Sequence, residues 1–167
     1  MTQPQEDLDR IRGYLQQQAA QRTIDELIAR VQEGVDDLAT AARGVANNVL
    51  NTIPEGDEWT PMDCLRHATS SNIHVAQQVL FAALEGYLPT DGEPEVPVDR
   101  EAILATHAEA IDSLYAHVRS ADPEANLELK WKHQFFGDLN WREWLLFLRI
   151  HSRDHARQLA AMSGASA

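Results

Sequence analysis

The sequence predicts an all-α protein, a four-helix bundle with an extra N-terminal helix or arm, from three observations. Apolar residues recur at three- and four-residue steps in four long segments, and proline- and glycine-rich stretches separate those segments. Alternating β-branched residues, which would indicate strands, are absent apart from a weak segment at residues 95–98. Amphipathic helices of this kind bury their apolar faces against one another, which favours a bundle.

The separating stretches lie at residues 51–58, 88–97 and 122–140, and each contains proline. Proline fixes φ and removes a backbone donor, so each stretch is expected to end a helix. These connections are longer than a minimal up-and-down bundle requires, so the predicted bundle allows for crossover connections.

The first helical segment covers residues 7–50. It is either one continuous helix or two helices separated by a break near residues 21–23. Its apolar stripe consists of Ile24, Leu27, Ile28, Val31, Val35, Leu38, Ala42 and Val45. The second segment covers residues 61–87 and has a well-marked start. Thr60 is suited to be its N-cap, Pro61 takes the first helical position, and Asp63 lies in the first turn.

The third and fourth segments cover residues 100–119 and 141–162. The fourth is expected to begin after Asn140, which pairs with Glu143 in a capping-box pattern, and to end before Gly164. The predicted organisation is an N-terminal extension or extra helix at 1–21, one bundle domain at 22–163 and a disordered tail at 164–167.

The chain has 167 residues and a formal net charge of −12, from 14 basic and 26 acidic residues. Nucleic acids and anionic membranes attract basic surfaces, so neither is expected as a partner. The sequence has no apolar run of about 18 residues, no signal-peptide pattern, and one cysteine, Cys64, which excludes an internal disulfide. We therefore expect a cytoplasmic protein.

Two of the seven histidines, His151 and His155, stand four residues apart in the fourth segment. Residues at this spacing project from one helix face, so both imidazoles can bind one cation. The glutamate of a zinc-protease HExxH helix is missing, which excludes that class. The pair also continues the apolar stripe of its helix, so the alternative is a buried pair satisfied by hydrogen bonds.

A metal site needs a further ligand, for which His67 and His74 on the second segment are candidates. They share a face that is otherwise polar, so that face either meets solvent or borders a polar cleft. His107 and His117 lie among charged residues and are expected to be solvated. His133 follows Lys132 in the last loop, where it either lines a site or lies on the surface.

Two segments of the chain carry further motifs, EWTPMDCLRH at residues 58–67 and HQFFGDLNWREWLLFLRIHSRDHARQL at residues 133–159. These motifs resemble those of the DinB-like (DinB/YfiT) superfamily of metal-binding four-helix bundles. The resemblance implies a three-histidine site made of His67, His151 and His155, usually for nickel or zinc. It gives His74 no ligand role and implies that a homodimer forms through helix faces.

Three histidines and no carboxylate leave coordination positions open to water or substrate, as catalytic metals require. We therefore expect a small-molecule substrate and either hydrolysis or transfer of a low-molecular-weight thiol, two activities found among relatives. The alternative is a non-catalytic metal-binding or stress-response protein, because a fold does not specify a function. Asp63 is interpreted as a helix cap or as a residue that orients His67, and Cys64 as a small buried residue.

Overall fold

Five α-helices and one short hairpin make up residues 4–164, the part of the chain that this computed structural model describes. The helices are α1 (Gln5–Gln21), α2 (Ile24–Arg43), α3 (Pro61–Glu85), α4 (Arg100–Val118) and α5 (Trp141–Ala161), with a single 3-10 turn, η1 (Asn47–Val49), after α2. The predicted all-α class is confirmed.

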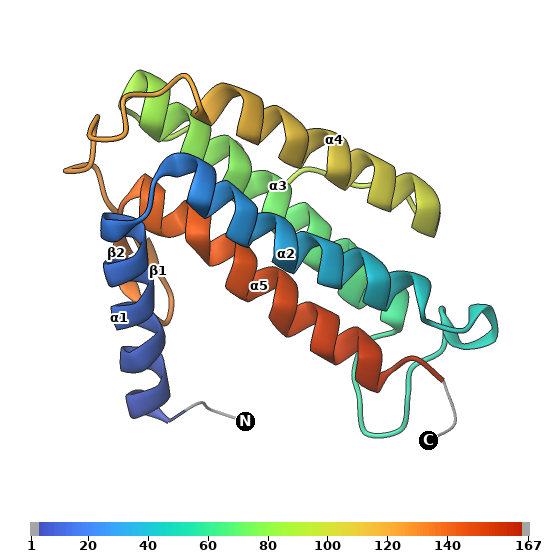
Figure 1. The fold of residues 1–167 in the computed structure, drawn as a ribbon. Helices are drawn as coiled ribbons and strands as arrows, with labels where there is room; N and C mark the ends of the chain where they lie inside the picture. Colours follow the sequence, from blue (N-terminus) through green and yellow to red (C-terminus); the bar gives the residue numbers. More distant parts are fainter. Residues whose placement is uncertain (1–3, 165–167) are drawn as a thin grey trace.

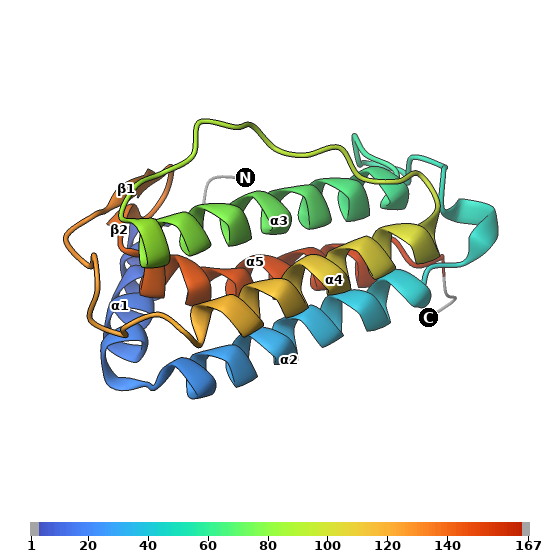
Figure 2. The ribbon, with the colours of Figure 1, turned by 90° about the horizontal axis from the view of Figure 1, so that it is seen from above.

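The last four helices form the bundle, and α1 lies steeply across one of its ends (Figure 1). Helices α2 and α3 each pack against both α4 and α5, which closes the bundle around a common core. Figure 2 shows α3 and α4 running in the same direction, because the connection between them returns along the length of the bundle. The bundle therefore has the crossover connection that the long linkers allow for.

Two helices approach each other closely where α2 meets α5. Gly34 of α2 faces the backbone of Arg149, and a Cβ added to this glycine would lie 2.8 Å from the Arg149 carbonyl oxygen. Only a residue without a side chain fits this crossing. The close contact holds α5 against the core two residues before His151.

Capping boxes fix the starts of α2, α3 and α5. Thr60 and Asp63 begin α3, and Asn140 and Glu143 begin α5, as the sequence predicts. A third box, Thr23 with Glu26, begins α2 and confirms the interruption after residue 21.

The predicted continuation of the first helical segment to residue 50 is wrong, because α2 ends at Arg43. Gly44 has a low helix propensity and occupies the C-cap. The guanidinium of Arg100 donates hydrogen bonds to the carbonyl oxygens of Ala42 and Val45 at 3.1 and 2.7 Å. These bonds satisfy carbonyl groups near the end of the helix, as a cap does.

The hairpin lies within a stretch where the sequence predicts no strand. Strands β1 (Trp131–His133) and β2 (Gly137–Leu139) pair antiparallel, with Trp131 opposite Leu139 and His133 opposite Gly137. The weak segment at residues 95–98 forms no strand. Trp131 stacks on Trp144 of α5, with ring centroids 5.4 Å apart, so packing against α5 rather than strand propensity holds the hairpin.

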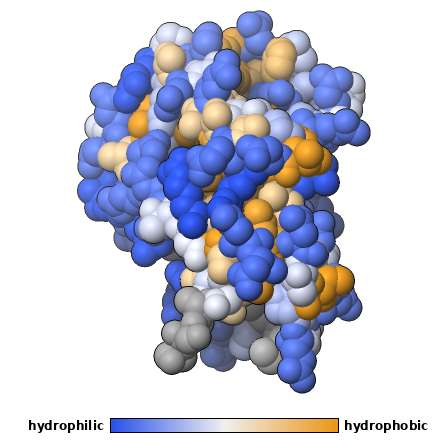
Figure 3. Space-filling model, turned by 90° about the vertical axis from the view of Figure 1, so that its right-hand side faces the viewer, coloured by the Kyte–Doolittle hydropathy of each residue, from blue (hydrophilic) through white to orange (hydrophobic). Residues whose placement is uncertain are grey.

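Helix α1 joins the same core through Leu8 and Leu15, whose side chains are buried. The predicted division into an extension at 1–21, a bundle at 22–163 and a tail stays a prediction. Residues 165–167 of that tail lie outside the described residues. Within residues 4–164, none of the helices combines the length and the apolar composition that crossing a membrane requires. On the face drawn in Figure 3, hydrophilic residues predominate and hydrophobic residues show as small patches.

Candidate metal centre

The two histidines of α5 lie one helical turn apart and point at each other. Their Nε2 atoms are 3.1 Å apart, and their ring planes are nearly perpendicular, at 81°. His151 and His155 are both partly buried, which agrees with their place on the apolar stripe of the helix.

His67 of α3 completes the cluster from the opposite side. One ring nitrogen from each of His67, His151 and His155 lies within 4.8 Å of the others. The capping box of α3 starts this helix seven residues earlier, so His67 lies in its second turn. Of the two alternatives for its polar face, the cleft is correct, because His67 and His74 both line a pocket.

A buried amide holds His151 from behind. The Nδ1–H of His151 donates to Oδ1 of Asn72 at 2.8 Å. Nδ2 of Asn72 donates to Ser152 Oγ and to His107 Nε2, each at 3.0 Å. In the orientation that the structure gives this amide, Oδ1 faces His151 and both hydrogens of the amide nitrogen have an acceptor. The proton of His151 therefore lies on Nδ1, and its Nε2 lone pair faces the cluster.

His155 is oriented in the same way by a residue of its own helix. Its Nδ1–H donates to Oε1 of Gln158 at 2.9 Å, which leaves Nε2 as the acceptor that faces His151. Metal-binding histidines are characteristically held by such a hydrogen bond from the other ring nitrogen.

Burial favours the neutral form of both imidazoles of α5. It lowers the pKa of His151 from 6.5 to about 3, with further lowering from the neighbouring His155 and His67. Burial also lowers the pKa of His155. Two neutral imidazoles whose lone pairs converge lack a proton to share, and a cation bound between them would supply the missing positive charge. Imidazole donors suit nickel and zinc, so these residues fit such an ion.

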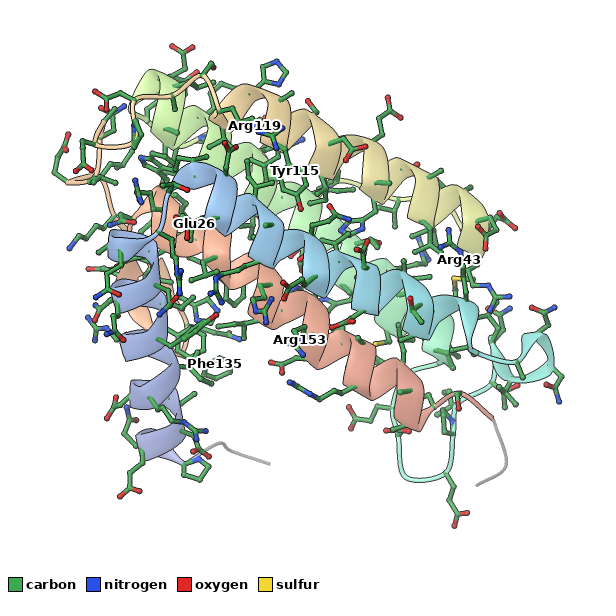
Figure 4. All side chains as sticks on the ribbon, in the orientation of Figure 1. Glu26, Arg43, Tyr115, Arg119, Phe135 and Arg153 are labelled. Carbon is green, nitrogen blue, oxygen red and sulfur yellow. The ribbon has the colours of Figure 1, made fainter. Side chains whose placement is uncertain are left out.

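A pocket of about 640 Å³ opens beside the cluster. One wall is the polar face of α3, with Ser71, His74 and Gln78. The opposite wall is aromatic and comes from the hairpin and α5; its rings are Trp131, His133, Phe135, Phe136, Trp144 and Phe147. Phe135 lies at the hairpin turn beside α1 and is labelled in Figure 4.

The structure also shows where the histidines outside the cluster lie. His107 is 2% exposed, so the prediction of a solvated side chain is wrong. It lies four residues from both Ile103 and Ile111, and therefore on the core face of α4. His133 is partly buried and lines the pocket, which decides between its two alternatives. His117 is exposed, as expected.

The remaining candidates have structural roles. Asp63 accepts the backbone N–H of Thr60 at 3.0 Å and so caps α3. Cys64 is fully buried, as expected, and burial raises the pKa of its thiol to about 12, which makes it a poor nucleophile. Asp154, which precedes His155 in α5, forms an ion pair with Arg157 at 2.7 Å.

Sequence reasoning did not identify Asn72 or the part played by Gln158. A signal for Asn72 was available, because Leu65, Asn72 and Val79 recur every seven residues on the core face of α3. A polar side chain at such a position needs a buried partner. The aromatic wall gave no comparable signal, because it depends on the fold of the hairpin.

Comparison with known proteins agrees with this architecture. The crystal structure of TT2238, a four-helix bundle protein, superposes with a TM-score of 0.58 at 26% sequence identity, covering 83% of this chain and 99% of that one. A search of curated proteins found no match. The DinB superfamily sequence profile matches residues 30–159, which include all three clustered histidines. The chain therefore belongs to the DinB superfamily.

Proposed function

We propose that this protein is a metal-dependent enzyme that acts on a small molecule through a nickel or zinc ion held by His67, His151 and His155. The observation that carries the proposal is the 3.1 Å separation of two Nε2 atoms whose Nδ1 atoms are already engaged. Two imidazoles arranged in this way present lone pairs to one point, as metal ligands do.

The pocket favours an enzyme over a non-catalytic metal-binding or stress-response protein. A structural zinc site is closed by four protein ligands, whereas a catalytic site keeps a position open. In this chain the histidine cluster adjoins a pocket of about 640 Å³, which is in the range of small-molecule sites. The ligand set of three neutral side chains leaves room for a substrate atom.

Residues of the chain have distinct roles in this proposal. Asn72 and Gln158 fix the ring orientations of His151 and His155. Trp144 and Phe147 form a wall that excludes water from one side of the pocket. A divalent ion in the site would supply Lewis acidity, either to polarise a carbonyl for hydrolysis or to deprotonate a low-molecular-weight thiol for transfer.

The test compares untagged protein in metal-stripped, nickel-loaded and zinc-loaded forms against two substrate panels. One panel contains esters and amides, and the other pairs small thiols with electrophiles. We expect turnover that requires metal, that disappears in His151→Ala, and that His117→Ala retains because His117 is exposed and outside the cluster. Metal-loaded protein that turns over neither panel would support the non-catalytic alternative.

A further inference from the structure

The hairpin presents a histidine whose hydrogen bonds fix its tautomer. Nδ1 of His133 accepts the backbone N–H of Phe135 at 3.0 Å and that of Phe136 at 3.3 Å. A backbone amide can only donate, so Nδ1 must be unprotonated. In the neutral ring the proton therefore lies on Nε2, and His133 is a hydrogen-bond donor at that atom.

The donor atom itself has no partner in the described part of the chain. Among residues 4–164, His133 Nε2 makes no hydrogen bond. This atom is also not fully buried. Packing restricts the ring, because Phe136 stacks on it with centroids 4.5 Å apart and Phe147 meets it edge-on at 4.7 Å. His133 is thus a rigid donor on the aromatic wall of the pocket.

Protonation would disrupt this arrangement. A proton on Nδ1 would break both bonds from the backbone amides, and burial lowers the pKa of His133 to about 4. The ring therefore stays neutral at neutral pH and offers one N–H without a full positive charge.

A second donor on the same face of β1 also lacks a partner. Trp131 and His133 are two residues apart, so both side chains project to one side of the strand, and both contact Trp144. The indole Nε1 of Trp131 is buried, and within residues 4–164 it meets no acceptor. Unpaired buried donors are uncommon because they lose their hydrogen bonds to water. The aromatic wall therefore carries two N–H groups, on His133 and Trp131, for which the described residues provide no acceptor.

We infer that His133 donates a hydrogen bond from Nε2 to the sp² oxygen of a bound ligand, a carbonyl or carboxylate group attached to a flat apolar body. The body would pack against the aromatic wall, and the oxygen would accept from His133. This inference rests on the proposed function in one respect, because it takes the pocket beside the histidine cluster as the substrate site.

The tautomer can be measured without any variant. Two-bond ¹H–¹⁵N correlation spectra of labelled, metal-free protein near neutral pH distinguish the two neutral forms of each histidine. We expect His133 to carry its proton on Nε2. A proton on Nδ1 would overturn the inference, because Nε2 would then be an acceptor.

Ligand binding is tested with benzamide, benzoate and toluene as probes. Asparagine at position 133 keeps an acceptor for the hairpin amides, because its side-chain oxygen lies near the place of Nδ1, but it loses the donor at Nε2. All three probes lose contact with the His133 ring in His133→Asn, but only the oxygen probes lose a hydrogen bond. We therefore expect binding of benzamide or benzoate to weaken by about tenfold more than binding of toluene, the worth of one hydrogen bond. An equal loss of affinity for all three probes would overturn the inference. Whichever of the two oxygen probes shows the additional loss of affinity identifies a carbonyl or a carboxylate as the preferred group.

The matched control is Asp138→Asn on the same hairpin, an exposed residue that does not line the pocket. It should bind all three probes as the wild type does. Equal affinity of wild type and His133→Asn for both oxygen probes would overturn the inference. If His133→Asn does not fold, the Nε2–H resonance of wild-type His133 decides, because it should shift on saturation with a bound oxygen probe and an unmoved resonance would overturn the inference.

Each titration is made with metal-free and with zinc-loaded protein, which separates the two proposals. If probe binding depends on His133 but the protein takes up no zinc, the proposed metal site is contradicted and the inference about His133 is not. Zinc uptake together with probe binding indifferent to His133 would contradict the present inference alone.

Discussion

At the scale of single residues, the candidate site depends on a buried amide as much as on the histidines themselves. Asn72 is 0% exposed and bonds His151, Ser152 and His107 at 2.8 to 3.0 Å. The amide binds three side chains at once, so it fixes the ring of His151, which faces the pocket, relative to the core. His151 would otherwise be free to rotate or to change tautomer.

Replacing Asn72 by leucine should therefore weaken metal binding. The substitution leaves the Nδ1–H of His151 without an acceptor, and loss of such an outer partner typically reduces metal affinity by about ten- to a hundredfold. Competition titrations of zinc against a chromophoric chelator would measure the change. Ser152→Ala is the control, because it removes another partner of Asn72 and leaves the bond to His151 intact. Similar affinities of wild type and Asn72→Leu would contradict this role.

A second prediction at this scale concerns pH. Burial lowers the pKa of His107 from 6.5 to about 4, so below about 6.5 the unfolded chain binds a proton that the folded chain does not. The free energy of unfolding should then fall as pH decreases from about 6.5 to about 4. Each tenfold change in proton affinity is worth about 1.4 kcal/mol, so His107 contributes roughly 3 kcal/mol to this loss.

Urea unfolding of metal-free protein at several pH values measures this contribution. Glutamine at position 107 offers an amide oxygen to Asn72 in place of the ring nitrogen and cannot be protonated in this range. His107→Gln should therefore lose less stability on acidification than the wild type. Parallel pH profiles of the two proteins would show that His107 does not titrate as described.

Sequence reasoning identified the residues of the cluster unequally. The four-residue spacing placed His151 and His155 together, because helix geometry is regular. His67 came from the family resemblance, since periodicity detects a polar face but cannot tell solvent from a polar cleft. His107 was misjudged from its charged neighbours in sequence, although its own spacing from Ile103 and Ile111 places it in the core.

At the scale of the elements, the contact between α2 and α5 sets the position of the two histidines that α5 carries. Gly34 permits the backbones to approach until an added Cβ would lie 2.8 Å from the Arg149 carbonyl oxygen and 3.0 Å from its Cα. Backbone atoms cannot rotate away as a flexible side chain can. Any side chain at position 34 must therefore push the helices apart.

Two glycine substitutions should have opposite effects for this reason. Alanine is favoured over glycine within a helix by about 1 kcal/mol, so Gly13→Ala in α1, with nothing within 4 Å, should stabilise the protein. Gly34→Ala gains the same propensity but should still destabilise by about 1 to 3 kcal/mol, because it overpacks the helix contact. Chemical unfolding of both variants measures the difference. Stabilisation by Gly34→Ala would show that α2 and α5 lie farther apart.

Helix starts were predictable, but the hairpin was not. A capping box consists of two residues that are three positions apart in the sequence, so the starts of α3 and α5 follow from local sequence. The strands of the hairpin are three residues long, and their stability comes from stacking of Trp131 on Trp144, a contact between distant parts of the fold. Local sequence therefore gave no account of the aromatic wall.

At the scale of the whole molecule, the bundle brings together two segments that lie far apart in the chain. The crossover between α3 and α4 carries the chain back along the bundle, and α3 and α5 pack directly against each other (Figure 2). His67 therefore meets the histidine pair at the contact of two rigid helices. The pocket beside the cluster is lined by residues of α3, α5 and the hairpin together with Ile11 of α1.

The central claim is that His67, His151 and His155 bind one divalent metal ion, and the most direct test is the metal content of untagged protein. After incubation with nickel or zinc and removal of the excess, we expect about one ion per chain, as for a mononuclear site. Alanine at any of the three positions should remove most of it, whereas His74→Ala and His117→Ala should retain it, because neither residue belongs to the cluster. A metal content that His151→Ala leaves unchanged would contradict the account.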